Sequence, residues 1–197
     1  LIVLLSARWR ESDAAFARTL ADIALTRFSD PEAGGFYFTD TGSELFHRPK
    51  PTMDDATPPG NGVMADALIR LGHLFAEPRY LEAAEATLLW ADARMRQYPA
   101  GHCTLLDALA DANHAPEQII VRGPEDQLTE WLTVCRDGYQ PLRISYGIPY
   151  EGNTTVPAYL PKLVSIEEQN SVVAFHCENF ACSPPIRSLD ALKATLR

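Results

Sequence analysis

The fold of this chain is decided by residues 61–98, NGVMADALIRLGHLFAEPRYLEAAEATLLWADARMRQY. Apolar residues recur here every three or four positions, the spacing that places side chains on one face of an α-helix. They form two successive stripes, Met64, Ala67, Leu68, Leu71, Leu74 and Phe75, then Leu81, Ala84, Leu88, Ala91, Met95 and Tyr98. Glu77-Pro78 separates the stripes, because proline suits the first turn of a new helix. The stretch therefore predicts two antiparallel helices joined by a short turn.

Helical patterns also occur on both sides of this pair, as far as residue 115. Residues 101–112 predict a third, shorter helix, and the chain opens within a helical pattern. After Ser12, a residue type that caps helices, an apolar stripe recurs at roughly helical spacing, made of Phe16, Leu20, Ile23 and Phe28. Residues 29–35 end that helix, and residues 36–39 predict a short extended piece.

The period of the sequence changes after residue 115. Three segments read as strands, at 118–121, 142–146 and 171–176, and two read as helices, at 128–134 and after Ser188. Residues 147–161 read as a loop. Strands and helices in this order are typical of a small α/β unit. The predicted fold is thus mainly α, with a helical part at 1–115 and a small α/β unit at 116–197.

Composition limits the classes of function. The chain has 197 residues, 46% of them hydrophobic, so it can bury a substantial core. Its formal net charge is −9 and it has no run of Lys and Arg, which argues against nucleic-acid binding and against an anionic membrane surface. The longest apolar run, residues 1–5, is too short to span a membrane and lacks the flanks of a signal peptide. We therefore expect a soluble cytoplasmic protein, and we read the chain as a fragment because it opens on Leu.

The four cysteines are Cys103, Cys135, Cys177 and Cys182. No CxxC occurs, so the sequence encodes neither a thioredoxin-type redox pair nor a zinc knuckle. We expect four free buried thiols in a reducing compartment. Two further functions are possible at Cys177 and Cys182, a metal site completed by Cys103, His102 or His114, and thiol redox chemistry. We rank both below the other functions considered. No cofactor and no metal is predicted.

The loop at residues 48–62, RPKPTMDDATPPGNG, is the first place to look for a functional site. It carries two cations, Arg48 and Lys50, and two adjacent carboxylates, Asp54 and Asp55. It then enters the helix of the first stripe at Asn61, a plausible helix cap. Loops held by a rigid scaffold often carry chemistry.

Two sets of motifs carry a family resemblance. The first set is GGFYFT at 34–39, RPK at 48–50 and DATPPGNGV at 55–63, and the second is VAFHCENFACSPP at 173–185. Together they resemble the C-terminal part of the YyaL and spermatogenesis-associated family of thioredoxin-domain-containing proteins. Members of that family carry a thioredoxin-like domain and then an α/α toroid similar to six-hairpin glycosidases and sugar epimerases. The resemblance implies that residues 1–112 supply the last toroid helices and that the rest is a terminal α/β appendage.

This sequence departs from the family pattern in the loop and in its length. The family has Ser where Pro59 and Gly62 stand, so two hydroxyl groups are lost from the loop. These residues do not include the thioredoxin-like domain, so we expect no redox activity to carry over to this chain. A toroid without most of its hairpins exposes apolar helix faces, so we expect self-association or a separate partner that supplies the N-terminal half.

The resemblance implies a funnel at the toroid mouth that takes a small sugar-like ligand. Glycoside chemistry needs two carboxyl groups, and Asp54 and Asp55 are the candidate catalytic residues, with Glu44 or Asp40 as a further partner because adjacent side chains diverge. The candidate substrate-binding residues are the cations and aromatic rings nearby together with the helix-start amide, namely Arg48, Lys50, Phe36, Tyr37 and Asn61.

Two functions remain open on this evidence. One is a carbohydrate-binding or carbohydrate-active module, hydrolase-like or epimerase-like, and the other is a binding or scaffold module with no catalytic cycle. Convergence of Asp54, Asp55 and Arg48 on one concave pocket favours the first. In the second, the prolines stiffen a crossover, and the charges are solvated or pair locally.

Overall fold

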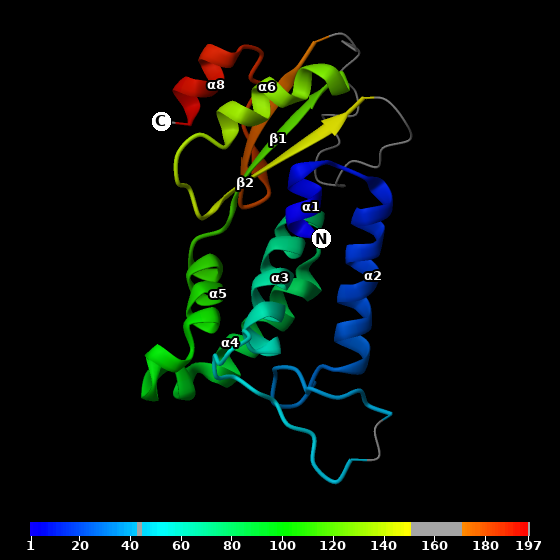
Figure 1. Ribbon diagram of the computed structural model, residues 1–197, viewed down its shortest axis with the longest axis vertical. Helices are drawn as coiled ribbons and strands as arrows, with labels where there is room; N and C mark the ends of the chain where they lie inside the picture. The colour runs from blue at the N-terminus through cyan, green and yellow to red at the C-terminus, as the bar shows by residue number, and fades with distance from the viewer. Residues whose placement is uncertain (43–44, 151–170, 197) are drawn as a thin grey trace. The chain divides into compact units, whose positions relative to one another are not determined.

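A computed structural model describes residues 1–42, 45–150 and 171–196 (Figure 1). Its elements in chain order are α1 (Ile2–Ala7), α2 (Glu11–Arg27), α3 (Gly60–Phe75), α4 (Pro78–Gln97), the 3-10 helix η1 (Pro99–Gly101), α5 (Cys103–Asn113), β1 (Glu117–Gly123), α6 (Glu125–Cys135), β2 (Arg143–Pro149), β3 (Val173–Glu178), β4 (Ala181–Cys182) and α8 (Leu189–Thr195). The predicted order, helices followed by a small α/β unit, is confirmed. None of the helices in the described ranges has the length and apolar character needed to cross a membrane.

The chain forms two compact units. The α/β unit comprises Leu1–Phe16, Leu74–Ala76 and Ala115–Arg197, and the helical unit comprises Ala17–His73 and Glu77–His114. The sheet-containing unit thus includes the first sixteen residues, although their periodicity resembles that of the helical part. The division of the chain into toroid helices and an appendage stays a prediction.

The sheet of the α/β unit has the strand order β2-β1-β3-β4. Strand β1 pairs parallel with β2 and antiparallel with β3, so that Ile120 lies opposite Tyr146 on one side and Phe175 on the other. The parallel pair needs a crossover connection, and α6 lies in that connection.

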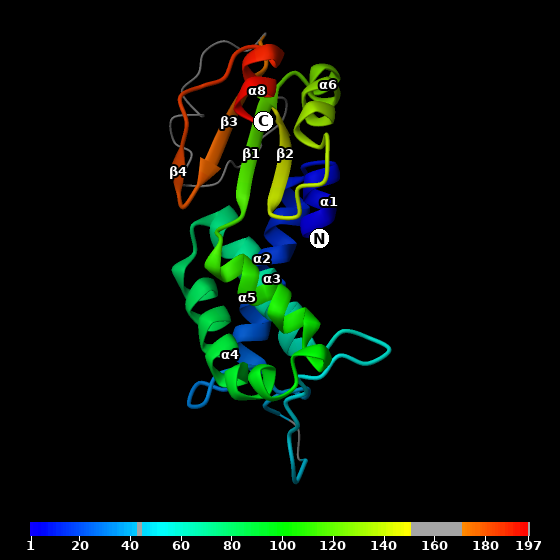
Figure 2. The same cartoon turned by 90° about the vertical axis from the view of Figure 1, so that its left-hand side faces the viewer.

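Both faces of this sheet are covered, as Figure 2 shows. Leu5 and Trp9 from the N-terminal segment pack against Ile120 and Tyr146, and the Trp9 ring meets the Tyr146 ring edge-on at 5.8 Å between centroids. On the other face, side chains of α6 and α8 pack against Ile119. A strand buried on both faces needs apolar residues at successive positions, which explains the run Ile119-Ile120-Val121.

A disulfide joins Cys177 to Cys182, so the prediction of four free thiols is wrong for this pair. The short strand β4, which the sequence did not predict, places Cys182 directly opposite Cys177, with their Cα atoms 4.0 Å apart. Asn179 and Phe180 form the intervening turn with φ angles of 48° and 63°, the left-handed backbone that tight hairpin turns require. Both sulfur atoms are used in this bond and are not available as thiolate ligands to a metal. Cys103 and Cys135 are free thiols, and only Cys135 is buried.

In the helical unit, α3 and α4 bury the predicted stripes. Leu68 and Leu71 on α3, and Leu88 and Met95 on α4, are all at most 5% exposed. Pro78 is the first residue of α4, as predicted. The periodicity therefore identified both helices and their inner faces.

The inner face of α2 differs from the prediction. Leu20 and Ile23 are 43% and 41% exposed, whereas the small side chains of Ala17, Ala21 and Ala24 are buried. Small side chains let the helix approach its neighbours closely, and buried Tyr80 donates a hydrogen bond to Asp22 at 2.6 Å from this side. Ser12 is not a cap either, because α2 begins one residue before it.

Candidate functional site

Asn61 ties the loop at residues 36–51 to the start of α3. Its side chain is buried, and its Nδ2 donates to the carbonyl oxygens of Phe36 and Pro51, each at 2.9 Å. Its Oδ1 accepts from the Phe36 backbone N–H at 2.6 Å. Because α3 begins at Gly60, Asn61 lies in the first turn and is not the N-cap that the sequence predicted. It bridges two chain segments instead.

Lys50 and Asp30 form a part-buried ion pair beside this bridge. Lys50 Nζ lies 2.7 Å from Asp30 Oδ2, and the two side chains are 12% and 11% exposed. Lys50 also donates to the Gly34 carbonyl at 2.8 Å, and the Tyr37 hydroxyl donates to Asp30 at 2.9 Å. The Lys50 ammonium holds the pKa of the Asp30 carboxyl well below its usual range, helped by backbone N–H donors. The Asp30 carboxyl is therefore ionised at neutral pH.

Aromatic rings line the cationic side chains of the loop. The Arg48 guanidinium lies 3.9 Å from the Tyr37 ring centroid, and its Nη2 donates to the Thr39 carbonyl at 2.7 Å. The Lys50 ammonium lies 4.3 Å from the ring centroid of Trp90 on α4. These cation–π contacts of Arg48 and Lys50 stabilise the position of the loop.

The sequence Gly34-Gly35 allows this loop to lie against α4. Both glycines have positive φ, 81° and 78°. A Cβ atom on Gly34 would lie 2.4 Å from the Ala86 carbonyl oxygen, and one on Gly35 would lie 2.7 Å from the Trp90 ring. Only glycine combines this backbone conformation with so close an approach.

Two hollows flank the loop within the helical unit. The first, which we call the polar hollow, has a volume of about 700 Å³ and is bounded by residues 29–36 and α4, with Asp30, Glu32, Arg79, Glu82 and Trp90 among its lining. The second, the aromatic hollow, has a volume of about 370 Å³, with Leu20, Phe28, Phe36, Tyr37, Phe38 and Asn61 among its lining. The predicted residues Phe36, Tyr37 and Asn61 therefore meet at one pocket.

The two candidate catalytic carboxylates lie elsewhere. The Asp54 carboxylate accepts from the Thr104 backbone N–H at 3.1 Å and from the Thr104 hydroxyl, and so caps the start of α5. Asp55 is exposed, and its Oδ1 accepts from the Ala56 N–H at 2.8 Å. Neither residue lines the polar or the aromatic hollow. The further partner Asp40 pairs with Arg27, and Glu44 lies outside the described residues.

Sequence reasoning missed Asp30 and Trp90. Asp30 follows Ser29 in a helix-ending segment and accepts from the N–H groups of Glu32 and Ala33. An aspartate in such a turn is expected to bond its own backbone, so the sequence contained a signal for its local role. The position of Trp90 within α4 offered none, because its importance comes from contact with a distant loop.

A second carboxylate cluster joins α3 to α5. Arg70 Nη2 lies 2.7 Å from buried Asp111 Oδ2, and Arg70 Nε lies 2.6 Å from Asp66 Oδ1. Burial raises the pKa of the Asp111 carboxyl to about 6; the Arg70 guanidinium opposes this shift, and neighbouring Asp66 adds to it. The spacing of Asp66 and Arg70, four residues apart, was the only part of this cluster visible in the sequence.

The raised pKa of Asp111 makes stability depend on pH. The pKa of Asp111 in the folded protein lies above the ordinary value of 3.8. Protonated Asp111 therefore contributes to the free energy of unfolding below pH 4, and this contribution is lost as pH rises to about 6. The unfolding free energy of wild type, relative to Asp111→Asn, should fall by on the order of 2 kcal/mol over this window. Urea unfolding at pH 4, 5, 6 and 7 measures the difference, with exposed Asp137→Asn as the control. A flat difference for Asp111→Asn would contradict the prediction.

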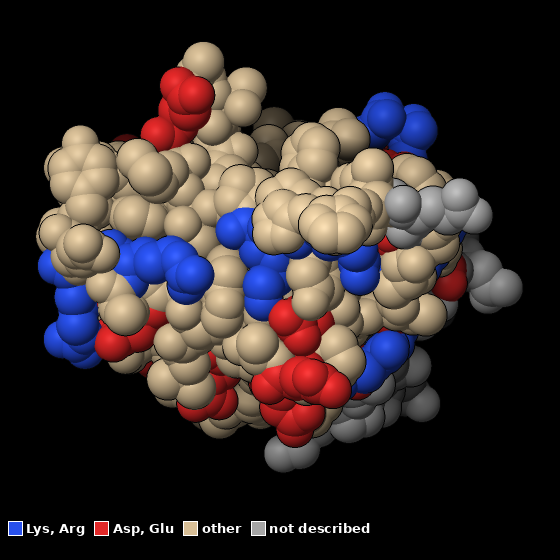
Figure 3. Space-filling view, turned by 90° about the horizontal axis from the view of Figure 1, so that it is seen from below, with Lys and Arg blue, Asp and Glu red and all other residues tan. Residues whose placement is uncertain are grey.

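Charges of both signs are interspersed on the face drawn in Figure 3. Lys and Arg side chains lie there among acidic and uncharged residues rather than in one continuous patch. On that face the structure thus shows no broad field of one sign.

The fold and the site define a class of protein: a helical scaffold that holds an aromatic and charged loop, joined in the chain to a small α/β unit. The chain is 30% identical over 193 residues to spermatogenesis-associated protein 20 of Rattus norvegicus, which covers 94% of this chain and 24% of the relative. The Mus musculus protein of the same name is 28% identical to this chain over 193 residues. The Homo sapiens protein is 27% identical to it over 176 residues, which are 87% of this chain and 22% of the human protein.

This similarity supports the resemblance to the spermatogenesis-associated family. The chain spans about a quarter of the length of the curated relatives it matches. No family model matches the chain.

Proposed function

We propose that the helical unit is a non-catalytic binding module that takes a sugar-like ligand in the polar hollow. One observation carries the proposal. The candidate catalytic residues Asp54 and Asp55 lie outside both hollows, whereas other charged side chains line the polar hollow. Asp54 is used as a helix cap and Asp55 is exposed, so the two carboxylates face no common cavity.

The chemistry of the polar hollow suits a hydroxyl-rich ligand. The carboxylates of Glu32 and Glu82 can accept hydrogen bonds from hydroxyl groups, and the Arg79 guanidinium can donate them. The indole of Trp90 adds an apolar wall. A volume of about 700 Å³ also lies within the usual range for small-molecule sites.

A catalytic module remains the alternative function, with hydrolase-like or epimerase-like activity. Inverting and retaining enzymes both need two carboxyl groups on opposite sides of the scissile bond. Asp55 is available for such a role, because within the described residues its carboxylate accepts a hydrogen bond only from the neighbouring Ala56 N–H. Turnover of a glycoside that Asp55→Asn abolishes would favour this alternative over simple binding.

We further propose that the helices form part of an α/α toroid, completed by self-association or by a separate N-terminal half. The exposed side chains of Leu20 and Ile23 on α2 support this proposal. Large apolar side chains at helical spacing on an outer face are the pattern that a neighbouring helix would cover.

A thermal-shift screen against monosaccharides and disaccharides tests the binding proposal. At a sugar concentration 100 times its Kd, binding should stabilise the fold by about 2.7 kcal/mol. Glu82→Gln should reduce the shift several-fold, because it removes a charged acceptor from the polar hollow. Glu85→Gln is the matched control, since Glu85 is also exposed on α4 and lies outside this hollow. No shift with any sugar, or equal shifts for the two variants, would count against the proposal.

A further inference from the structure

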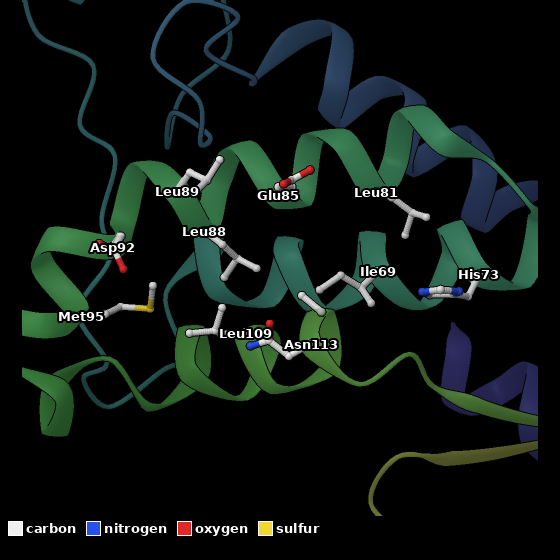
Figure 4. A pocket seen from close by; sticks show the side chains of 11 residues that line it. Ile69, His73, Leu81, Glu85, Leu88, Leu89, Asp92, Met95, Leu109 and Asn113 are labelled. Atoms are coloured by element: carbon white, nitrogen blue, oxygen red, sulfur yellow. The ribbon is translucent and has the colours of Figure 1, made fainter. Parts of the chain in front are cut away.

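A third hollow lies within the helical unit, between α3, α4 and α5 (Figure 4). We call it the three-helix groove, and its volume is about 430 Å³. Apart from Leu89, its lining residues differ from those of the polar hollow. An inference from the groove therefore stands independently of the proposed sugar site.

The floor of the groove is apolar. Ile69, Leu88 and Met95 contribute buried side chains to its lining, and Leu109 on α5 forms part of the opposite wall. Leu89 also lines the groove and is 70% exposed. An apolar chain placed here would cover side chains that now meet water, which is favourable in proportion to the area covered.

The lining of the groove carries acceptor oxygens, two carboxylates and one amide oxygen. Glu85 and Asp92 lie seven residues apart on α4, hence on the same side of the helix, and Asn113 lies on α5. Figure 4 shows Glu85 between Leu81 and Leu88 along the α4 wall, and Asp92 near Met95. Among the described residues, the lining contains neither lysine nor arginine. The groove therefore combines an apolar floor with negative charge.

The remaining titratable residue of the lining adds no positive charge at neutral pH. Burial lowers the pKa of the His73 imidazole, so this ring is neutral there. Arg96 pairs with the lining carboxylate of Asp92 at 2.8 Å, and the Arg96 side chain is 79% exposed. An exposed pair of this kind neutralises little of the field inside the groove.

We propose that the three-helix groove binds a small organic ammonium ion with an apolar tail. The tail lies along Ile69, Leu88 and Met95, and the ammonium group donates hydrogen bonds to the Glu85 carboxylate. An ammonium group has three donors and no acceptor, so it matches a rim that offers acceptor oxygens. Its charge makes those bonds stronger than bonds to a neutral hydroxyl.

Three probes with one tail and different head groups test this proposal: n-octylammonium, n-octanol and octanoate. Isothermal titration of the full chain, below the concentration at which each probe aggregates, should show saturable binding of one n-octylammonium per chain. Binding of n-octanol should be about tenfold weaker because it lacks the charge, and octanoate should not bind. Shortening the ammonium tail should weaken binding about fourfold per methylene removed.

Variants locate the binding. Glu85→Gln should weaken n-octylammonium about fivefold to tenfold and leave n-octanol unchanged, whereas Glu82→Gln, three residues away and outside the groove, should change neither. Ala112→Phe should abolish binding of both by filling the groove from α5, where Ala112 lines it and is exposed. Circular dichroism of each variant establishes that it is folded.

Three results would each overturn the proposal. The first is equal affinity for n-octylammonium and n-octanol, and the second is the absence of saturable binding of n-octylammonium. The third is wild-type affinity for n-octylammonium in folded Glu85→Gln and Ala112→Phe. A lysine-rich amphipathic peptide serves as a separate arm. Binding of that peptide at the groove without binding of n-octylammonium would replace the small molecule with a protein helix as the occupant.

Discussion

Asn61→Leu should lower the free energy of unfolding by about 4 kcal/mol, because it removes the three hydrogen bonds between the loop and α3. Leucine has nearly the shape of asparagine, so the loss comes from polarity rather than volume. The Phe36 N–H and C=O and the Pro51 C=O would be left in a buried place without their partner. Each such group costs about 1–3 kcal/mol, and partial access of water brings the sum below the simple total.

Urea unfolding followed by circular dichroism measures this change. Asn113→Leu is the matched control, because Asn113 is an exposed asparagine at the end of α5, and it should change stability by less than about 0.5 kcal/mol. If Asn61→Leu costs no more than its control, the side chain of Asn61 does not hold the loop.

Lys50→Met should lower the free energy of unfolding by about 3 kcal/mol at pH 7. The substitution keeps most of the apolar stem and leaves the Asp30 carboxylate, which is only 11% exposed, without its cation. The exposed pair of Arg96 and Asp92 supplies the control, since Arg96→Met should cost less than about 0.5 kcal/mol. The double variant Lys50→Met/Asp30→Ala should recover part of the loss, because it removes the uncompensated charge as well.

The cost of Lys50→Met should also depend on pH. The folded pKa of Asp30 is depressed below its ordinary value of 3.8, so the stability it contributes is present above about pH 4 and is lost as pH falls towards the folded pKa. A protonated Asp30 needs no cation, and the gap between wild type and variant should therefore narrow from pH 5 down to pH 2. A gap that stays constant over this range would show that Lys50 acts through packing rather than charge.

The local sequence pattern predicted the positions of the helices correctly, but for α2 it predicted the wrong buried face. The stripes of α3 and α4 were confirmed because bulky side chains on those helices do face the core. On α2 the same rule chose Leu20 and Ile23, whereas the structure buries Ala17 and Ala21. Periodicity identifies a face that is apolar, but it does not decide which of two apolar faces meets the rest of the unit.

The predicted site was partly assembled and partly dispersed by the fold. Arg48, Lys50 and Tyr37 lie together as the sequence suggested, because one short loop carries all three. The adjacent carboxylates do not join them: Asp54 is drawn to α5 by Thr104, a residue 50 positions further along the chain. The density of charged residues along the loop indicated where polar contacts would form. It did not indicate which residues elsewhere in the chain would be their partners.

The sequence by itself determined the order of the long helices and of β1, β2 and β3, the turn at Pro78 and the helix that follows Ser188, since these depend on residues within a few positions of each other. Only the tertiary structure decided the pairing of Lys50 with Asp30, the bridge from Asn61 to Phe36, and the bond from Cys177 to Cys182. The first two join residues 20 and 25 positions apart, and the third depends on a strand too short to predict. Such contacts follow from packing of the whole unit, in which burial selects one partner among several chemically equivalent ones.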